Sequence, residues 1–360
     1  MTKRNYGIDL CRILSMLGIV VLHVIGKGGA QQLVNGSYTA GYWASEWLFI
    51  CAVCSVDVFA IMSGYLGLNK KASSLYRALE LISVVLFFSV LSTSCFAIFY
   101  PEKVLNIKSI IVGLFPPMAD RYWYIMNFIP ILIMQPFLNK MLLSLSEKQH
   151  MMLCILSLSI FTILPSFAMK DFFRFDSGYS FVWLLCLYVL GAYLKRSRID
   201  TIRIPKKYLV PAFLAMSFIL LFGNMFVWFV LGTNYRYFVD YNSPISLIMS
   251  ICLFLLFKNL SIEKGKGILK TLSSAAFDVY IVHGHIFIFD FIIKDLFVEV
   301  SNLPVPLIIP VILLSAAFIY IICAAFGLIR LKLFEMIGLN RLILKCSTAI
   351  DQLIYSDSFQ

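Results

Sequence analysis

The sequence predicts an all-α fold: a polytopic transmembrane helix bundle of about ten spans, with both termini in the cytoplasm. Hydrophobic residues make up 61% of the 360 residues and charged residues only 14%. A soluble domain is typically about 45–50% apolar and about a quarter charged. Apolar runs of about 18 or more residues recur along the chain, each long enough to cross a hydrocarbon core of about 30 Å. The basic residues are also unevenly divided between the loops on the two sides.

Each span is expected to be a helix, because backbone polar groups inside lipid must be hydrogen-bonded within their own segment, and the alternating pattern of a barrel is absent. The expected spans are 8–26, 43–66, 79–99, 122–144, 151–168, 179–194, 208–232, 243–257, 273–293 and 304–329. They form one transmembrane domain, 1–332, followed by a cytoplasmic C-terminal tail, 333–360. The segments between spans are too short to bury cores of their own.

The distribution of charge orients these spans. With ten spans, most of the 30 basic residues fall at the amino terminus, in the even-numbered loops and in the C-terminal tail. This asymmetry is the positive-inside signal, and it places both termini in the cytoplasm. The net charge of +11 is therefore topological, and nucleic acid is not an expected partner. The first span lacks a small-residue cleavage pattern and is expected to be retained rather than removed as a signal peptide.

The first span carries two costly polar residues, Arg12 and His23. Eleven steps of about 100° bring their side chains within roughly 20° of the same helix face, about 16 Å apart along the axis. Polar residues inside a membrane are candidates for function, and sharing one face favours a joint role. Two structural interpretations stay open: Arg12 can snorkel to the interface beside Asp9, and His23 can simply hydrogen-bond a neighbouring helix.

The second span runs in the opposite direction and places Glu46 at a depth similar to that of His23. Glu46 is expected to orient the imidazole as a carboxylate orients a catalytic histidine, although an interfacial carboxylate in water is an equal alternative. Asp57 follows inside the span. Its cytoplasmic end contains Ser63, Gly64 and Tyr65, where glycine permits a close approach of a helix or a ligand.

Two later segments add candidate residues. Trp123 opens the fourth span on the outer side, where aromatic residues also commonly form an interfacial belt. His283 and His285 lie in the ninth span, and their side chains point about 200° apart, so a helix brings only one of them into a given cavity. No metal-binding spacing surrounds them, and the C-x-x-C of residues 51–54 is expected to be buried packing.

These residues carry a resemblance. The sequence is similar to the membrane acyltransferase-3 family, whose members O-acylate surface polysaccharides and related glycans. "NYGIDLCRILSMLGIVVLH" resembles the family's opening helix, and "SVDVFAIMSGYL" resembles its G-V-D…S-G-Y segment. "YWYIMNFIPILIMQPFLN" resembles its W-Y…P-x-x-N span, and "VYIVHGHIF" resembles its late histidine segment, with His283 at the motif position. The match departs from the family's R-x-x-R, because Arg77 is followed by Glu80 at the second position.

The resemblance implies an acyl-CoA donor, most often acetyl-CoA, and a glycan or polysaccharide hydroxyl as acceptor. The lack of metal-binding spacings separately predicts that no metal is used. It implies a multi-pass protein of the lipid bilayer, in the bacterial cytoplasmic membrane, and leaves a homo-oligomer possible. The expected catalytic residues are His23 and Glu46. The residues expected to hold the donor are Arg12, Arg77, Lys70 and Lys71. The residues expected to hold the acceptor are Asp57, Ser63, Tyr65, Trp123 and His283.

Alternatives stay open at this point. His23 can act as general base on the acceptor hydroxyl or can form a transient acyl-imidazole, and the sequence does not separate the two. A membrane transporter or flippase for a small solute or lipid-linked sugar is the rival function, although repeats and short broken span pairs typical of transporters are not visible. No feature favours a non-catalytic receptor.

Overall fold

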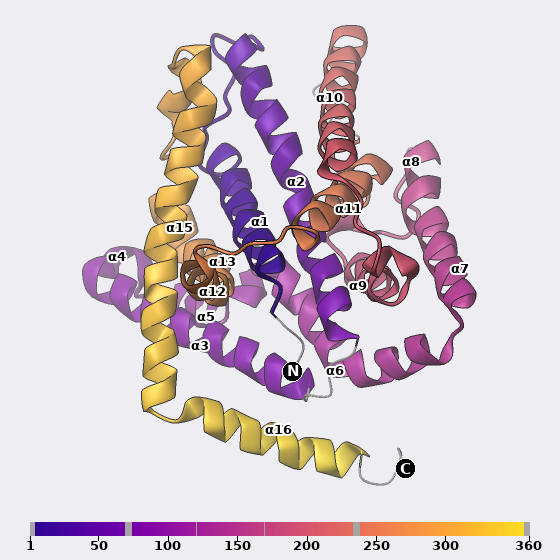
Figure 1. The fold of residues 1–360 in the computed structure, drawn as a ribbon. Coiled ribbons are helices and arrows are strands. Elements are labelled where there is room, and N and C mark those ends of the chain that lie inside the picture. The colour runs from indigo at the N-terminus through magenta and orange to yellow at the C-terminus, as the bar shows by residue number, and fades with distance from the viewer. Residues whose placement is uncertain (1–3, 69–73, 120, 169, 233–237, 356–360) are drawn as a thin grey trace.

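The computed structural model describes residues 4–68, 74–119, 121–168, 170–232 and 238–355 (Figure 1). Within these ranges the chain forms helices and no β-strand, apart from an isolated bridge between Val34 and Ser37. The predicted all-α fold is therefore confirmed. The α-helices are α1 Tyr6–Ile25, α2 Ala40–Gly67, α3 Ser74–Phe99, α4 Pro101–Val104, α5 Ile107–Leu114, α6 Trp123–Ser144, α7 Glu147–Leu158, α8 Leu164–Ala168, α9 Phe181–Arg196, α10 Lys206–Leu231, α11 Pro244–Lys258, α12 Lys266–Ser274, α13 Ala276–Gly284, α14 Ile286–Ile288, α15 Val305–Met336 and α16 Leu339–Tyr355.

Among the described residues, seven helical segments are long and apolar enough to cross a membrane, or eight if a bent pair counts as one span. Six of them are α1, α2, α6, α10, α15 and Leu75–Phe99 of α3; the seventh, Glu147–Ala168, joins α7 and α8. The expected count of about ten exceeds this number. The two shortest expected spans, 179–194 and 243–257, correspond to α9 and α11, which have 16 and 15 residues.

Helix α9 is apolar because it packs against other helices, whereas a lipid-facing span is apolar because it contacts lipid. Most of its residues are buried among other helices, including Trp183, Leu184, Leu187 and Tyr188, which have no exposed surface. Its strongest packing is against α2. A Cβ on Gly64 of α2 would lie 1.9 Å from the Tyr188 carbonyl oxygen, so only glycine permits this approach. An apolar segment enclosed in this way does not need the length of a membrane span.

Side-chain caps define where several of these helices begin. The Asn5 side chain accepts hydrogen bonds from the backbone N–H groups of Gly7 and Ile8, at 2.9 and 3.3 Å. Thr39 caps α2 and Ser180 caps α9 in the same way. Such caps satisfy donors that the first helical turn leaves without partners, and they fix the register in which α1 presents its polar residues.

The span expected at 273–293 is broken. Helix α13 ends at Gly284, His285 takes an extended conformation, and the chain resumes as α14 and a π-helical turn, Phe289–Ile293. The segments before and after the break differ in direction by 62°. His285 stabilises the break, because its Nε2 donates to the Gly113 carbonyl at 3.1 Å and its Nδ1 accepts from the Phe287 N–H at 3.4 Å.

The C-terminal part is helical beyond the expected domain boundary. Helix α15 runs through residue 332 to Met336, and α16 follows within the expected tail. Figure 1 shows α16 crossing the end of the bundle below α15, close to the start of α3. A buried ion pair joins α15 to α13, with Arg330 bonded to both carboxylate oxygens of Asp278 at 2.8 and 2.7 Å. The cytoplasmic placement of the termini stays a prediction.

Candidate active site

The first helix brings one residue of its polar pair into contact with the broken segment. His23 lies in the last turn of α1, and its Nδ1 is 2.8 Å from Nε2 of His283 in α13. The Tyr122 hydroxyl donates to the Ile281 carbonyl at 2.7 Å, which fixes this turn of α13 against the start of α6. The two imidazoles are 260 positions apart in sequence, and the structure places them side by side.

The hydrogen bonds of the histidine pair assign the tautomers of both neutral rings. Nδ1 of His283 contacts the Val279 carbonyl oxygen, which only accepts, so this nitrogen carries the proton. Nε2 of a neutral His283 is then an acceptor, and Nδ1 of His23 must donate to it. It follows that Nε2 of His23 is unprotonated. The pair therefore has one basic nitrogen, Nε2 of His23, and the neutral imidazole of His283 orients this ring through its hydrogen bond to Nδ1.

His23 lines a cavity of about 310 Å³, here called the aromatic pocket. Its wall includes Trp123, whose ring lies 4.5 Å from that of Tyr179 and 5.7 Å from that of Tyr241. Tyr124 and Tyr280 complete a group of four lining tyrosines. A cavity of this size, with aromatic walls and a few polar groups, has the character of a small-molecule site.

A charged cluster lies beside the histidine pair. Asp290 accepts from Arg121 at 2.9 and 3.0 Å, and Lys27 Nζ lies 3.3 Å from its Oδ1. The Arg121 guanidinium stacks 5.0 Å from the ring of Phe289, which in turn makes an edge contact with His23. Two cations against one carboxylate leave an excess positive charge. Lys27 and Arg121 were not among the residues expected at the site, because 94 positions separate them and no local spacing signals this cluster.

Arg12 lies in the first half of α1, eleven positions before His23. Its guanidinium donates to Ser273 at 2.8 Å and lies 3.5 Å from Asp9, and 29% of its side chain is exposed. Asp9 also binds Arg4, with contacts of 2.6 and 2.9 Å. Arg77 is close enough to interact electrostatically with Arg12. Lys70 and Lys71, also expected here, lie outside the described residues.

A second, polar cavity of about 800 Å³ opens at the end where α1 begins, here called the polar mouth. Tyr65 lines it and donates to Asp200, which Lys195 and Lys258 also contact at 2.9 and 3.3 Å. Burial raises the pKa of Asp200, but these bonds and charges outweigh that effect and lower it below its usual value. Four basic and two acidic residues line the mouth: Arg4, Arg203, Lys258, Lys266, Asp200 and Glu263.

Glu46 belongs to a different network from the one expected. It accepts hydrogen bonds from Gln31 at 2.9 Å and from Asn224 of α10 at 3.2 Å. The partner that orients His23 is His283, so the orienting role predicted for Glu46 is corrected. Counting residues along the two antiparallel helices predicted a similar depth in the membrane for Glu46 and His23. A similar depth does not determine which neighbouring helix each side chain faces.

Two further residues expected to hold acceptor have partners inside the bundle. Asp57 is fully buried; it accepts from Trp183 Nε1 at 3.0 Å and contacts Ser250 at 3.5 Å. It therefore joins α2 to α9 and α11. Ser63 donates to the Phe59 carbonyl within its own helix at 2.8 Å. Of the residues expected at the acceptor, Trp123 is the one that shares the aromatic pocket with His23.

Within the described residues, no group of three or more His, Cys, Asp or Glu side chains is arranged to hold a metal ion. A family model described as an acyltransferase domain matches residues 5–329. No curated protein and no solved structure matches the chain. Because the family match covers nearly the whole length, the chain belongs to the acyltransferase-3 family, as its motifs predicted, and its apolar helices are those of an integral membrane protein.

Proposed function

We propose that this membrane acyltransferase moves an acetyl group from cytoplasmic acetyl-CoA to a hydroxyl of a cell-surface or exported glycan, in the bacterial cytoplasmic membrane. The observation that carries the proposal is the tautomer of the histidine pair. Nδ1 of His23 donates to His283, so Nε2 is the unprotonated, basic nitrogen of a neutral ring that lines the aromatic pocket. A positioned base of this kind typically accelerates a proton transfer by about 10²–10⁴-fold.

In the proposed transfer, His23 moves one proton from the acceptor hydroxyl to the leaving thiolate. As the acceptor oxygen forms a bond to the thioester carbonyl carbon, its proton passes to Nε2 of His23. The carbon–sulfur bond then breaks, and the leaving thiolate takes the proton back from Nε2. His283 keeps its hydrogen bond to Nδ1 throughout and stabilises the imidazolium that forms between the two events.

The polar mouth supports binding of the donor's phosphates. Its lining has more basic than acidic residues, and it opens at the end of α1 that positive-inside topology assigns to the cytoplasm. Arg12 lies near this end, about 16 Å from His23 along the helix. Guanidinium groups suit phosphate through paired hydrogen bonds. An acyl-CoA bound here would extend its arm along α1 toward the histidine pair.

The aromatic pocket supports binding of the acceptor. Its tyrosines and Trp123 offer flat apolar faces with hydroxyl groups at their edges, which suit a sugar ring. Lys27 also lines this pocket and belongs to the charged cluster beside His23. A cationic group near the carbonyl stabilises the oxyanion that develops during transfer.

The test is transfer of label from radiolabelled acetyl-CoA to candidate glycans by purified protein in nanodiscs. His23→Ala is expected to lower the transfer rate at least 100-fold. His150→Ala is the matched control, because His150 is a buried histidine that bonds the Val189 carbonyl at 3.1 Å, remote from the pair in sequence and in its contacts. Full transfer by folded His23→Ala would refute the catalytic assignment.

A second variant tests the donor end. Arg12→Ala is expected to raise the KM for acetyl-CoA about tenfold with little change in kcat, because one charge-assisted contact is worth about 1.5 kcal/mol. An unchanged KM would remove Arg12 from the donor site.

A rapid-quench experiment without acceptor distinguishes general-base transfer from an acyl-imidazole intermediate. Label retained on His23 would favour the acyl-imidazole.

A further inference from the structure

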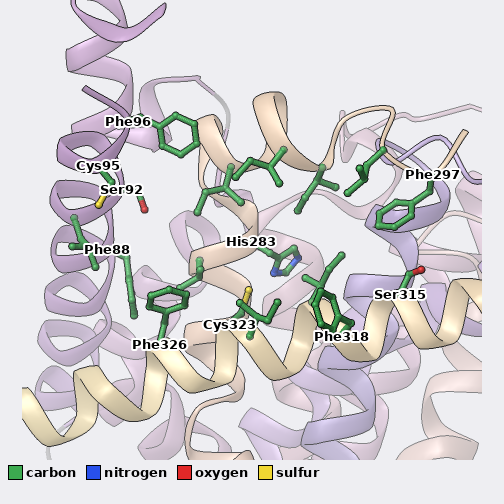
Figure 2. A pocket seen from close by; sticks show the side chains of 18 of the residues that line it. Phe88, Ser92, Cys95, Phe96, His283, Phe297, Ser315, Phe318, Cys323 and Phe326 are labelled. Carbon is green, nitrogen blue, oxygen red and sulfur yellow. The ribbon is translucent and has the colours of Figure 1, made fainter. Parts of the chain in front are cut away.

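A third cavity lies on the other side of the histidine pair. It is a groove of about 940 Å³ whose floor is formed by α13, α14 and the turn after it, and whose walls are α3 and α15 (Figure 2). Its volume is near the upper end of the range for ligand pockets, about 300–1,000 Å³. We call it the lateral groove, and its aromatic lining comprises Phe88, Phe96, Phe297, Phe318 and Phe326.

The lateral groove opens toward the lipid-facing surface. On its α15 wall, Leu314 is 70% and Phe318 66% exposed, and the four-residue spacing continues through Ile322 and Phe326. All four residues line the groove, and twelve positions of a helix extend about 18 Å. This length is close to the hydrocarbon depth of one leaflet, about 15 Å. The shape and chemistry therefore fit a hydrocarbon chain lying along the bilayer normal.

The lateral groove is continuous with the candidate catalytic pair. Figure 2 shows His283 at the middle of its floor, between the side chains of α3 and those of α15. The same ring contacts Nδ1 of His23 through its Nε2, and His23 lines the aromatic pocket. The histidine pair thus separates an apolar cavity that faces lipid from an aromatic cavity that suits a sugar.

The outer wall of the groove is joined to the charged cluster. Asp295 N–H donates to the Lys27 carbonyl at 3.0 Å, and Phe297 N–H donates to the Gly28 carbonyl at 2.8 Å. The Lys27 side chain itself pairs with Asp290, beside Arg121. An anionic head group at this end of the groove would meet the excess positive charge of the cluster.

We propose that the acceptor glycan is presented on a lipid, with its hydrocarbon tail in the lateral groove, its linking phosphate at the Lys27–Arg121 cluster and its sugar in the aromatic pocket. This inference rests on the proposed acyl transfer and names the class of acceptor. The soluble donor does not need a cavity open to lipid, and its phosphates match the polar mouth at the other end of α1.

The experiment uses a diazirine-bearing polyprenyl phosphate, irradiated with the full-length protein in nanodiscs without acyl-CoA. Cross-linked residues are located by mass spectrometry and are expected on the groove faces of α3, α13 and α15. The filling variant Ser315→Trp/Ile322→Trp is expected to lower labelling at least tenfold. The control Leu313→Trp/Ile321→Trp also places two tryptophans on α15, away from the groove, and is expected to stay within twofold of wild type.

Competition identifies the occupant. Unlabelled polyprenyl phosphate is expected to displace the probe at concentrations where phosphatidylglycerol of similar chain length does not. Equal displacement by phosphatidylglycerol would mean that the groove holds ordinary bilayer lipid, and cross-links spread over all lipid-facing helices would also overturn the proposal. Because binding is measured without donor, a protein that binds the probe but transfers no acetyl group would refute the proposed function and leave the groove assignment standing.

Discussion

The role of His283 gives the sharpest test of the site. Replacing it with leucine removes the acceptor that holds the proton on Nδ1 of His23. A buried donor without an acceptor costs about 1–3 kcal/mol, which the ring avoids by moving its proton to Nε2. The basic nitrogen is then protonated in most molecules. At about 1.36 kcal/mol for each tenfold change, His283→Leu should lower kcat about 5- to 150-fold with KM little changed.

The assay is single-turnover acetyl transfer at saturating donor, combined with ¹⁵N NMR of labelled histidine to read the tautomer of His23. His283→Gln is the informative companion, because its amide oxygen can accept the Nδ1 proton and should restore kcat to within about tenfold of wild type. A His283→Leu protein with wild-type kcat would refute the reasoning. So would a slow His283→Leu protein in which His23 kept its Nδ1 proton, since the tautomer would then not be the cause.

Two stability predictions follow from contacts within the bundle. Gly64→Ala should lower Tm by several degrees, because its Cβ would meet the backbone of α9 at 1.9 Å, whereas Gly223→Ala, with nothing within 4 Å, should leave Tm unchanged or raise it. Equal Tm values for the two variants in detergent would contradict the close packing of α2 and α9. Asp278→Ala should cost about 3–5 kcal/mol in denaturant unfolding, because it leaves the Arg330 guanidinium buried without its partner. The double change to Asp278→Ala/Arg330→Met should recover part of that loss, and an additive result would show that the two residues are not coupled.

Much of the fold follows from local properties of the sequence. Runs of apolar residues predicted the long spans because lipid imposes both length and helical backbone. Helical geometry predicts that Arg12 and His23 share one face of α1, and the structure places Arg12 in the first half of α1 and His23 in its last turn. The choice of His283 over His285 came from motif position. The structure gives it a physical basis, since one ring contacts His23 and the other caps α14.

The rest depends on contacts that no local pattern encodes. The break at His285 requires the Gly113 carbonyl, 172 positions away. The short helices α9 and α11 have the hydropathy of spans because they are enclosed by protein, and composition does not distinguish enclosure in protein from contact with lipid. The cluster of Lys27, Arg121 and Asp290 joins three segments that lie far apart in the sequence, so no local pattern predicts it.

The correction at Glu46 has a physical reason that bears on the mechanism. A carboxylate beside His23 would place a charge in a water-poor bundle, where an ion needs a partner and further hydrogen bonds to offset the cost of desolvation. A neutral imidazole supplies the same acceptor for Nδ1 without that charge. Nδ1 of His283 donates its proton to the Val279 carbonyl. The backbone of α13 therefore orients the His283 ring, and His283 in turn orients His23. The position of the basic nitrogen therefore depends on α13, which the buried Asp278–Arg330 pair fixes to α15 five residues before His283.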